Sequence, residues 1–329
     1  RSRLSVKILK KILAYRFSAF GDVAMTVPVC IEFLEQNPDV QIIFITRENF
    51  KDLFDKHPRL KFHGISFDDY KGVFGIRKLT KQLIRNFNPD YVADLHDVIR
   101  TKMVNTIFFR HGFKVFQIDK GKEEKEKLTN VWNLDKFPLK RTVERYADVF
   151  RRMGFKLELS HQLRTQYDSK KDIGFAPFAQ HKGKMMPLEK SFELARILAR
   201  THKVYFFGGG KDENEILNNW EKQIPNTQSL SGKLTLKEEL SQISELELMI
   251  SMDSANMHLA SLMGTRCVSV WGSTHHFAGF LGYGQSEDDI VHVKDLSCRP
   301  CSVFGDKECF RGDYACLEEL NIQKIIDRI

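Results

Sequence analysis

Residues 251–284 read SMDSANMHLASLMGTRCVSVWGSTHHFAGFLGYG. An apolar run, Leu246–Ile250, precedes this stretch, and the helix-capping residues Asp253 and Ser254 follow it closely. The next segment, 255–264, is short and mostly apolar, and residues 267–271 form a second apolar run. The pattern predicts a buried strand, a turn, a buried helix, a second strand and a glycine-rich loop, which is typical of a parallel α/β sheet.

This arrangement also predicts a place for an anion. A helix that starts directly after a parallel strand presents free backbone N–H groups at the carboxyl edge of the sheet. We therefore expect a phosphate group to bind at the amides around residues 254–257. The next strand ends in the small residues Gly272, Ser273 and Thr274, which let a ligand approach the backbone. The same pattern also fits an ordinary crossover with a capped helix and no ligand.

The segment DSANMHLASLMGTRCVSVWGST, residues 253–274, resembles the nucleotide-diphosphate site of glycosyltransferase family 9, the lipopolysaccharide heptosyltransferases. The sequence departs from the family pattern at Ala255, Arg266 and Ser273, where the family has Gly, Pro and Pro. The positions that match are Asp253, Ser254, His258, Ala260, Gly264, Gly272 and Thr274. The resemblance implies the α/β GT-B fold, with two Rossmann-like doubly wound domains facing a cleft. It implies that the donor binds at Asp253, Ser254, Ala255, Asn256, Met257, His258 and Thr274.

The alternation of strands and helices supports two such domains. Strands are predicted near residues 11–17, 41–46, 60–65, 91–95, 114–118, 172–176, 204–207, 246–250 and 267–271. Helices are predicted near 23–35, 47–55, 76–87, 100–110, 141–153, 187–200, 212–220, 236–243 and 255–264. We expect domains over residues 1–165 and 166–329, a linker within 160–171, a solvated loop over 119–127, and a C-terminal helix that packs back on the first domain.

Composition limits the partners. The chain has 329 residues and a formal net charge of +8, which fits an anionic partner such as a lipid surface or a phosphorylated sugar. The charge is spread along the chain, which argues against nucleic acid. No apolar run is long enough to cross a membrane, and the basic segment 1–17 lacks a signal-cleavage pattern, so we interpret it as leading into the first strand. We expect a reducing, cytoplasmic location.

A second motif, RFSAFGDV over residues 16–23, follows the first predicted strand. By itself Asp22 reads as a helix N-cap. The motif also resembles the Arg-x-Ser-x-x-Gly-Asp-Val pattern of family 9, in which the Asp is the proposed general base. The resemblance therefore implies that Asp22 deprotonates the acceptor hydroxyl in an inverting transfer, with Ser18 and Gly21 on the acceptor side.

Further donor residues are implied in the second half of the chain. Lys184, with Lys182 as a rival, lies shortly before Pro187 and resembles the family's phosphate-binding Lys, although a loop Lys is usually only solvated. Three glycines around Gly209 allow a nucleoside to lie close to the backbone. Glu213 resembles the family's ribose-binding acid, or it complements the dipole at a helix start.

On the acceptor side, the segment DLHDVIRT from Asp94 to Thr101 resembles a family motif. It implies that Arg100 and Lys102 hold anionic groups of a lipid A–inner core acceptor. A basic helix surface without a ligand explains Lys102 almost equally well. His96 is a candidate for a second acid/base group.

Four cysteines, Cys298, Cys301, Cys309 and Cys316, crowd near the C-terminus. Their spacing is compatible with a structural zinc ion, with reversible disulfides or with packed free thiols. No Asp-x-Asp motif is placed to hold a diphosphate through a metal, so we expect transfer without a metal cofactor.

Together these features predict an enzyme that transfers a sugar, heptose from ADP-heptose, to a growing lipopolysaccharide core at the inner-membrane surface. Two alternatives stay open at this point. One is a GT-B nucleotide-sugar epimerase, which acts on the donor without an acceptor. The other is a non-enzymatic protein that binds anionic ligands and carries a four-cysteine zinc module. The sequence does not fix the sugar, the linkage or the oligomeric state.

Overall fold

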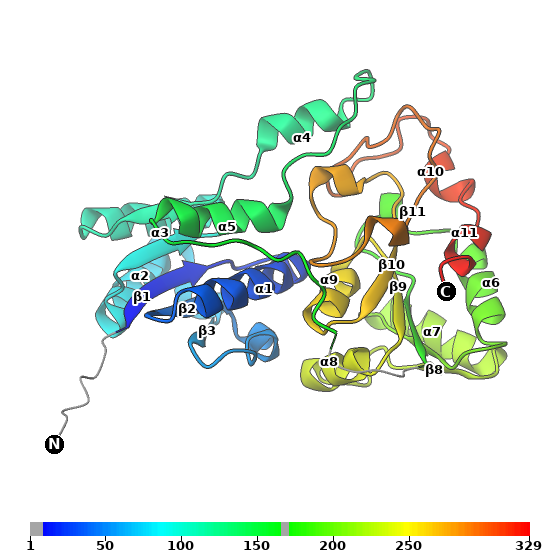
Figure 1. Cartoon of the computed structure of the whole chain (residues 1–329), viewed down its shortest axis with the longest axis horizontal. Helices are drawn as coiled ribbons and strands as arrows, with labels where there is room; N and C mark the ends of the chain where they lie inside the picture. The colour runs from blue at the N-terminus through cyan, green and yellow to red at the C-terminus, as the bar shows by residue number, and fades with distance from the viewer. Residues whose placement is uncertain (1–8, 166–170) are drawn as a thin grey trace. The chain divides into compact units, whose positions relative to one another are not determined.

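The structure is a computed structural model that describes residues 9–165 and 171–329. The chain divides into two compact units (Figure 1). The first unit ends at Lys120 and resumes over Thr142–Ser160, and the second contains Gly121–Arg141 and His161–Ile329. Residues 121–141 therefore belong with the second unit, which differs from the predicted domain range of 1–165. The N-terminal eight residues and part of the predicted linker, 166–170, lie outside the described residues.

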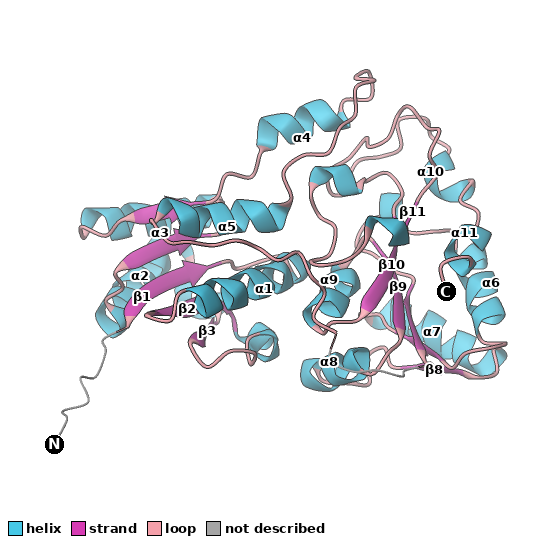
Figure 2. Ribbon diagram, in the orientation of Figure 1, coloured by secondary structure: helices cyan, strands magenta, loops and turns pink. Residues whose placement is uncertain are grey.

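The first unit contains one sheet of five strands in the order β3-β2-β1-β4-β5, and all neighbouring pairs are parallel. Helices lie on both faces of this sheet (Figure 2), where α1 packs with α5 and α2 with α3. The strands are β1 (Lys10–Tyr15), β2 (Val40–Arg47), β3 (Leu60–Ile65), β4 (Tyr91–Asp94) and β5 (Val115–Gln117). The helices are α1 (Phe20–Gln36), α2 (Gly72–Phe87), α3 (Ile99–Arg110) and α5 (Thr142–Arg152), with the 3₁₀ helices η1 (Glu48–Leu53) and η2 (Phe67–Tyr70).

Apolar patterning explains this sheet. The last four residues of β1, Ile12–Tyr15, have no exposed surface, as expected of a central parallel strand that is covered on both faces. Helix α2 buries Ile76, Leu79 and Leu83, which lie on one helical face, and leaves its other faces to solvent. The core of the unit is thus formed between the sheet and one face of each helix.

The second unit repeats this topology and adds one strand. Its six parallel strands have the order β11-β10-β9-β6-β7-β8. They are β6 (Ile173–Ala176), β7 (Val204–Phe206), β8 (Thr227–Ser229), β9 (Leu248–Met252), β10 (Arg266–Val270) and β11 (Ile290–Val291). The helices are α4 (Lys122–Thr129), α6 (Leu188–Leu198), α7 (Lys211–Gln223), α8 (Leu236–Ser244), α9 (Ala255–Leu262), α10 (Ala315–Glu318) and α11 (Gln323–Ile326). Short 3₁₀ helices are η3 (Lys182–Lys184), η4 (His276–Ala278) and η5 (Glu287–Asp289).

Two expectations about elements are wrong. Most of the predicted loop 119–127 is helical, in α4, because its Lys and Glu residues are good helix formers and Leu128 at its end is buried. The predicted helix at 47–55 is the shorter 3₁₀ helix η1. The C-terminal helix α11 contributes the fully buried Ile325 to the hydrophobic core of the second unit, and the expected packing of this helix on the first domain stays a prediction.

Each sheet has a point at which the strand order reverses. In the first unit this point lies between β1 and β4, and in the second between β6 and β9. Ligands of doubly wound proteins bind at the carboxyl ends of the strands that flank such a point. The residues that follow β1, β4, β6 and β9 are therefore the first place to search for a functional site.

Within the described parts of the chain, no helix combines the length and the apolar character needed to cross a membrane.

Candidate active site

In the second unit, three predicted donor residues meet at the reversal point. Lys184 follows β6, Asp253 follows β9 directly, and Thr274 lies beyond β10. The Asp253 carboxylate accepts a hydrogen bond from the Thr274 hydroxyl at 2.8 Å, and the same oxygen lies 3.1 Å from Lys184 Nζ. Asp253 is almost completely buried, so this ion pair holds the ammonium group at the carboxyl edge of the sheet.

The start of α9 lies beside this ion pair. Ser254 is the N-cap residue in an extended conformation, but its hydroxyl is 3.1 Å from that of Ser251 and does not cap the helix. The side chains of Ser254, Ala255 and Asn256 are partly exposed, whereas Met257 and His258 are buried. Met257 and His258 can therefore contact a ligand at this edge mainly through their backbone, and the uncapped first turn suits an anion.

The glycine turn after β7 has one carboxylate partner. Glu213, in the first turn of α7, accepts a hydrogen bond from the Gly209 amide at 2.7 Å. Burial raises the pKa of Glu213, and the Gly209 hydrogen bond opposes that rise. A side chain at Gly209 would meet open space, so the close approach of a ligand is sterically possible there. Both interpretations of Glu213, ribose contact and helix-start charge, agree with this geometry.

Arg299 organises the loop that carries Thr274. Its buried guanidinium donates hydrogen bonds to the carbonyl oxygens of Gly272 at 2.5 Å, Thr274 at 2.9 Å and Trp271 at 3.2 Å. Burial lowers the pKa of Arg299 to about 10, which leaves the group charged at neutral pH. Arg299 lies between Cys298 and Cys301 in the sequence, and no motif around it predicts that it binds these carbonyl groups.

In the first unit, Asp22 lies at the start of α1 beside Arg16. Its Oδ2 accepts a hydrogen bond from Arg16 Nη2 at 2.7 Å and a longer one, 3.4 Å, from the Ala19 amide. Arg16 also donates to the Leu95 carbonyl at 2.7 Å, so it joins the ends of β1 and β4. The N-cap position is Ala19, which corrects the interpretation of Asp22 as the N-cap residue: Asp22 lies three residues inside and reaches back to the cap.

His96 lies on the other side of the first reversal point. Its Nδ1 accepts a hydrogen bond from the Phe17 amide, and its Nε2 lies near the Ser18 hydroxyl, each at 3.4 Å. Burial, with the nearby charges of Arg16 and Lys120, lowers the pKa of His96 to about 3. The imidazole is therefore neutral at physiological pH, with its proton on Nε2.

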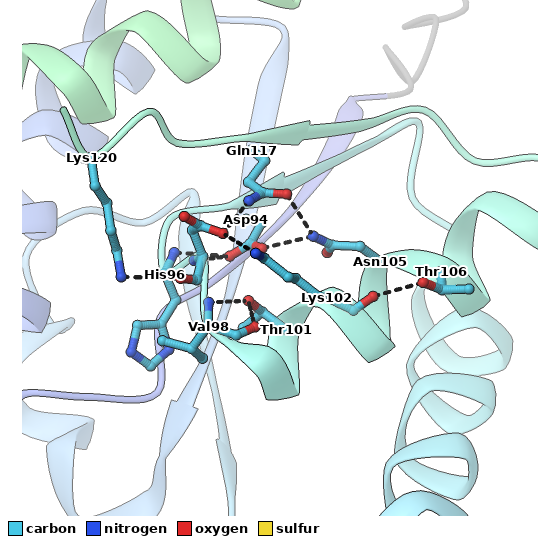
Figure 3. A network of polar contacts seen from close by, with 10 residues as sticks. Asp94, His96, Val98, Thr101, Lys102, Asn105, Thr106, Gln117 and Lys120 are labelled. Atoms are coloured by element: carbon cyan, nitrogen blue, oxygen red, sulfur yellow. Dashed lines mark hydrogen bonds and ion pairs between the residues drawn. The ribbon is translucent and has the colours of Figure 1, made fainter. Parts of the chain in front are cut away.

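A buried carboxylate shapes the turn that follows β4 (Figure 3). Asp94 Oδ1 accepts hydrogen bonds from the amides of His96 at 2.8 Å and Asp97 at 3.0 Å, and Oδ2 accepts one from Asn105 at 2.7 Å. The ammonium group of Lys102 lies 3.6 Å from Asp97 Oδ1. Lys102 thus contacts the turn itself, and its predicted contact with the acceptor stays a prediction.

Arg100 makes a different contact. Its guanidinium lies over the Phe67 ring, 4.2 Å from the ring centroid, and Arg47 lies over the same ring at 5.6 Å. Arg47 also donates to the Phe17 carbonyl at 3.0 Å. The exposed Arg47 was not predicted to be a site residue. Its position at the end of β2, which places it at this edge of the sheet, is the signal that could have identified it.

Comparison with known proteins identifies the family. Residues 76–309, well over half of the chain, match the family model described as glycosyltransferase family 9 (heptosyltransferase). The chain belongs to glycosyltransferase family 9. It is therefore an enzyme, a glycosyltransferase, and the non-enzymatic alternative is set aside.

Relatives of this family 9 chain match over nearly its whole length. It is 24% identical over 326 residues to a lipooligosaccharide heptosyltransferase 2 from Campylobacter jejuni subsp. jejuni, covering 97% of each protein. A family 9 glycosyl transferase structure from Veillonella parvula DSM 2008 superposes with a TM-score of 0.72 at 17% identity, covering 97% of this chain and 95% of that one. The E. coli heptosyltransferase WaaC with ADP-2-deoxy-2-fluoro heptose superposes with a TM-score of 0.66 at 15% identity, covering 90% and 97%. These likenesses confirm the GT-B fold.

The cysteines of this family 9 chain do not form a metal site as they are placed. All four are free thiols, and burial raises the pKa of Cys316 to about 12, which disfavours the thiolate that a zinc ligand requires. Over residues 9–165 and 171–329, no group of three or more His, Cys, Asp or Glu side chains is placed to hold a metal ion. The zinc interpretation does not fit this geometry, and it stays a hypothesis for direct measurement.

Proposed function

We propose that this chain transfers heptose from ADP-heptose to the core of a lipopolysaccharide or lipooligosaccharide. The observation that carries the proposal is the Lys184–Asp253–Thr274 arrangement beside the uncapped start of α9. The name of the C. jejuni relative and the ligand of the WaaC structure support the choice of sugar and nucleotide.

The second unit provides what a departing diphosphate needs. Lys184 Nζ has three N–H donors, and Asp253 orients the group while leaving donors for phosphate oxygens. The amides at the start of α9 add partial positive charge. As the bond between the anomeric carbon and the diphosphate oxygen breaks, negative charge grows on that oxygen, and these groups stabilise it. Glu213 and the open backbone at Gly209 suit the ribose hydroxyls.

Asp22 is the proposed general base. In an inverting transfer, the acceptor hydroxyl attacks the anomeric carbon and loses its proton to Asp22, while ADP leaves from the opposite face of the sugar. The 2.7 Å contact with Arg16 fixes one carboxylate oxygen and thereby the orientation of the group. His96, neutral and held by Phe17 and Ser18, lines the same edge and suits hydrogen bonds to the acceptor sugar rather than proton abstraction.

The acceptor is proposed to be the lipid A–inner core, presented at the cytoplasmic face of the inner membrane. Arg100 is exposed and basic, which suits phosphate or carboxylate groups of such an acceptor. Ser18 lies between β1 and α1, and Gly21 lies next to Asp22 in the first turn of α1. Transfer of this kind requires no metal cofactor if Lys184 and the helix amides carry the diphosphate charge.

A transfer assay tests the function directly. Purified chain is incubated with a lipid A–inner core acceptor and, in separate reactions, ADP-heptose, a UDP-sugar or a GDP-sugar, and the acceptor is analysed by mass spectrometry. We expect one heptose to be added with ADP-heptose alone. Conversion of ADP-heptose to another sugar nucleotide without an acceptor would indicate an epimerase, and transfer from only the UDP- or GDP-sugar would contradict the proposed donor.

A further inference from the structure

The N-terminal ends of α2 and α3 expose large apolar side chains to solvent. Val73 and Phe74 begin α2 and Ile99 begins α3, and the exposed fractions of Phe74 and Ile99 are 84% and 81%. None of the three contributes to the hydrophobic core of the first unit. Large apolar side chains that are left open together indicate an interaction surface.

These side chains belong to one surface. Helix α2 packs against α3 (Figure 1), and each helix begins after a strand of the same parallel sheet, so both start at the carboxyl edge. The stacking of Arg100 on Phe67 at 4.2 Å also joins the first turn of α3 to η2, which directly precedes α2. This is the edge that carries Asp22 and His96.

The charge of the two helices has a single sign. Neither α2 nor α3 contains an Asp or a Glu, while the preceding η2 contributes Asp68 and Asp69, of which Asp68 pairs with Lys71 at 3.3 Å. The basic residues of the two helices are Arg77, Lys78, Lys81 and Arg85 in α2, and Arg100, Lys102 and Arg110 in α3. Exposed apolar residues among basic ones are the composition by which helices bind an anionic membrane surface.

We propose that Val73, Phe74 and Ile99, with Arg77 and Lys78, form a docking surface for an anionic lipid bilayer. The three apolar side chains insert into the headgroup region, and the two cations contact lipid phosphates. The inference rests on the proposed function in one respect, because a lipid-linked acceptor has to reach the edge that carries Asp22. A nucleic acid would complement the charge but would leave Phe74 and Ile99 exposed, so the bilayer fits the surface better.

Vesicle sedimentation without any sugar substrate tests this surface. The full chain is mixed with vesicles of phosphatidylethanolamine and phosphatidylglycerol, and with vesicles of phosphatidylcholine alone. We expect binding to the anionic vesicles, weakened by salt, and binding at least about tenfold weaker for the Val73→Ser/Phe74→Ser double variant. Arg77→Gln should weaken binding about fivefold, the usual effect of one basic residue at an anionic surface.

Two controls are matched to these variants. Phe109→Ser removes a phenylalanine that is 75% exposed in the last turn of α3, at the opposite end of that helix, and should leave vesicle binding unchanged. Arg85→Gln removes a positive charge from the last turn of α2 and should likewise leave vesicle binding unchanged. All of these positions are exposed, and melting curves check that each variant is folded.

The outcomes separate this inference from the proposed function. Equal vesicle binding by the double variant overturns the docking surface. Trp132 is an exposed aromatic residue of the second unit, and loss of vesicle binding by Trp132→Ser with normal binding by Phe74→Ser also overturns the docking surface. Binding of oligonucleotides without binding of vesicles overturns it as well. A chain that binds vesicles through Phe74 but transfers no heptose contradicts the proposed function alone. A chain that transfers heptose but binds no anionic vesicle contradicts the docking surface alone.

Discussion

The reversal points of the two sheets carry the same kind of pair, a cation and a carboxylate, built in opposite ways. In the first unit, Arg16 and Asp22 are only six residues apart, because Arg16 directly follows β1 and Asp22 lies in the first turn of α1. In the second unit, Lys184 follows β6 and Asp253 follows β9, so the pair forms only when these strands are neighbours. The local pair holds a carboxylate in place with a cation that never loses its charge, whereas the long-range pair holds a flexible ammonium in place with a buried carboxylate.

The difference suggests a division of labour. A carboxylate fixed through one oxygen suits proton abstraction, and an ammonium group oriented by a buried acid suits phosphate binding. Under the proposed function, the same topology, used twice, supplies a base at one edge and an anion site at the other. This comparison can be broken or sharpened by variants that affect one pair and spare the other.

The largest effect is expected at the first pair. Asp22→Asn keeps the size of the side chain and its reach to the Ala19 amide but removes the base, so we expect kcat to fall by about 10²–10⁴-fold. Calorimetric titration should show near-normal ADP binding, and the melting temperature should change little. Glu35→Gln, an exposed carboxylate of the same helix, is the control and should retain the wild-type rate. An Asn variant with the wild-type rate would show that Asp22 only shapes the turn.

A smaller effect is expected at the second pair. Lys184→Gln removes the ammonium group next to Asp253, and we expect ADP affinity to fall by about ten- to a hundredfold, the loss of one or two charge-assisted hydrogen bonds. Lys182→Gln changes the rival residue, whose ammonium lies over the Tyr314 ring at 4.7 Å, and should leave affinity within about threefold of wild type. The opposite ranking of the two variants would assign the phosphate contact to Lys182.

Burial of His275 makes the folding equilibrium of the second unit depend on pH, by about tenfold between pH 7.5 and 5.5. Burial lowers the pKa of His275 to about 2, with the positive charges of His276 and Arg299 adding to the effect. Its Nδ1 accepts a hydrogen bond from the Phe277 amide. Below the ordinary value of about 6.5, the unfolded chain binds a proton that the folded chain does not, so stability is lost as the pH falls from about 6.5 towards 2.

His275→Asn, which keeps an acceptor in place of Nδ1, isolates this contribution. Between pH 7.5 and 5.5 we expect the variant to lose about 1.4 kcal/mol less free energy of unfolding than the wild type, measured by urea denaturation at both pH values. A comparable change for His111→Asn, an exposed histidine at the C-terminal end of α3, would contradict the assignment of this pH dependence to the burial of His275.

The smallest effect is expected from removing metal. Since the four C-terminal cysteines are not arranged as ligands, dialysis against a chelator should leave the melting temperature within about 1 °C of its starting value. Elemental analysis for zinc and iron before dialysis gives the second reading. About one equivalent of either metal, with a fall in melting temperature after its removal, would restore the hypothesis drawn from the cysteine spacing.

Much of the fold was predictable because central parallel strands are continuous apolar runs. QIIFIT in β2 and the apolar run leading into β9 are examples of this pattern, and the residues Asp253, Ser254 and Gly264 mark the turns on either side of α9. Strand β8 was missed because its sequence, TQS, contains no apolar residue, and β11 was missed because two residues are too short to show a period. The strand order itself is a product of long-range pairing, which local patterns do not encode.

The candidate site shows the same limit. Asp22, Lys184 and Asp253 could be named from motifs that lie next to strand ends. Their partners are harder to find, because Arg299 reaches the carbonyls of residues 271–274 from a segment that contains no catalytic pattern. Lys102 shows a further limit: the motif that suggested an acceptor contact contains no sign that the folded turn places Asp97 Oδ1 3.6 Å from the Lys102 ammonium group.

The grouping of residues 121–141 with the second unit has a consequence for taking the protein apart. The chain passes between the units at Lys120–Gly121, at Arg141–Thr142 and at Ser160–His161. A single proteolytic nick at any one of these places leaves the units joined by the other two covalent connections. A fragment that starts at His161 also lacks the Leu139 amide that donates to the Phe277 carbonyl, and Arg141, which pairs with Glu287. Independent expression of the second unit therefore calls for co-expression or fusion of the excised 121–141 peptide.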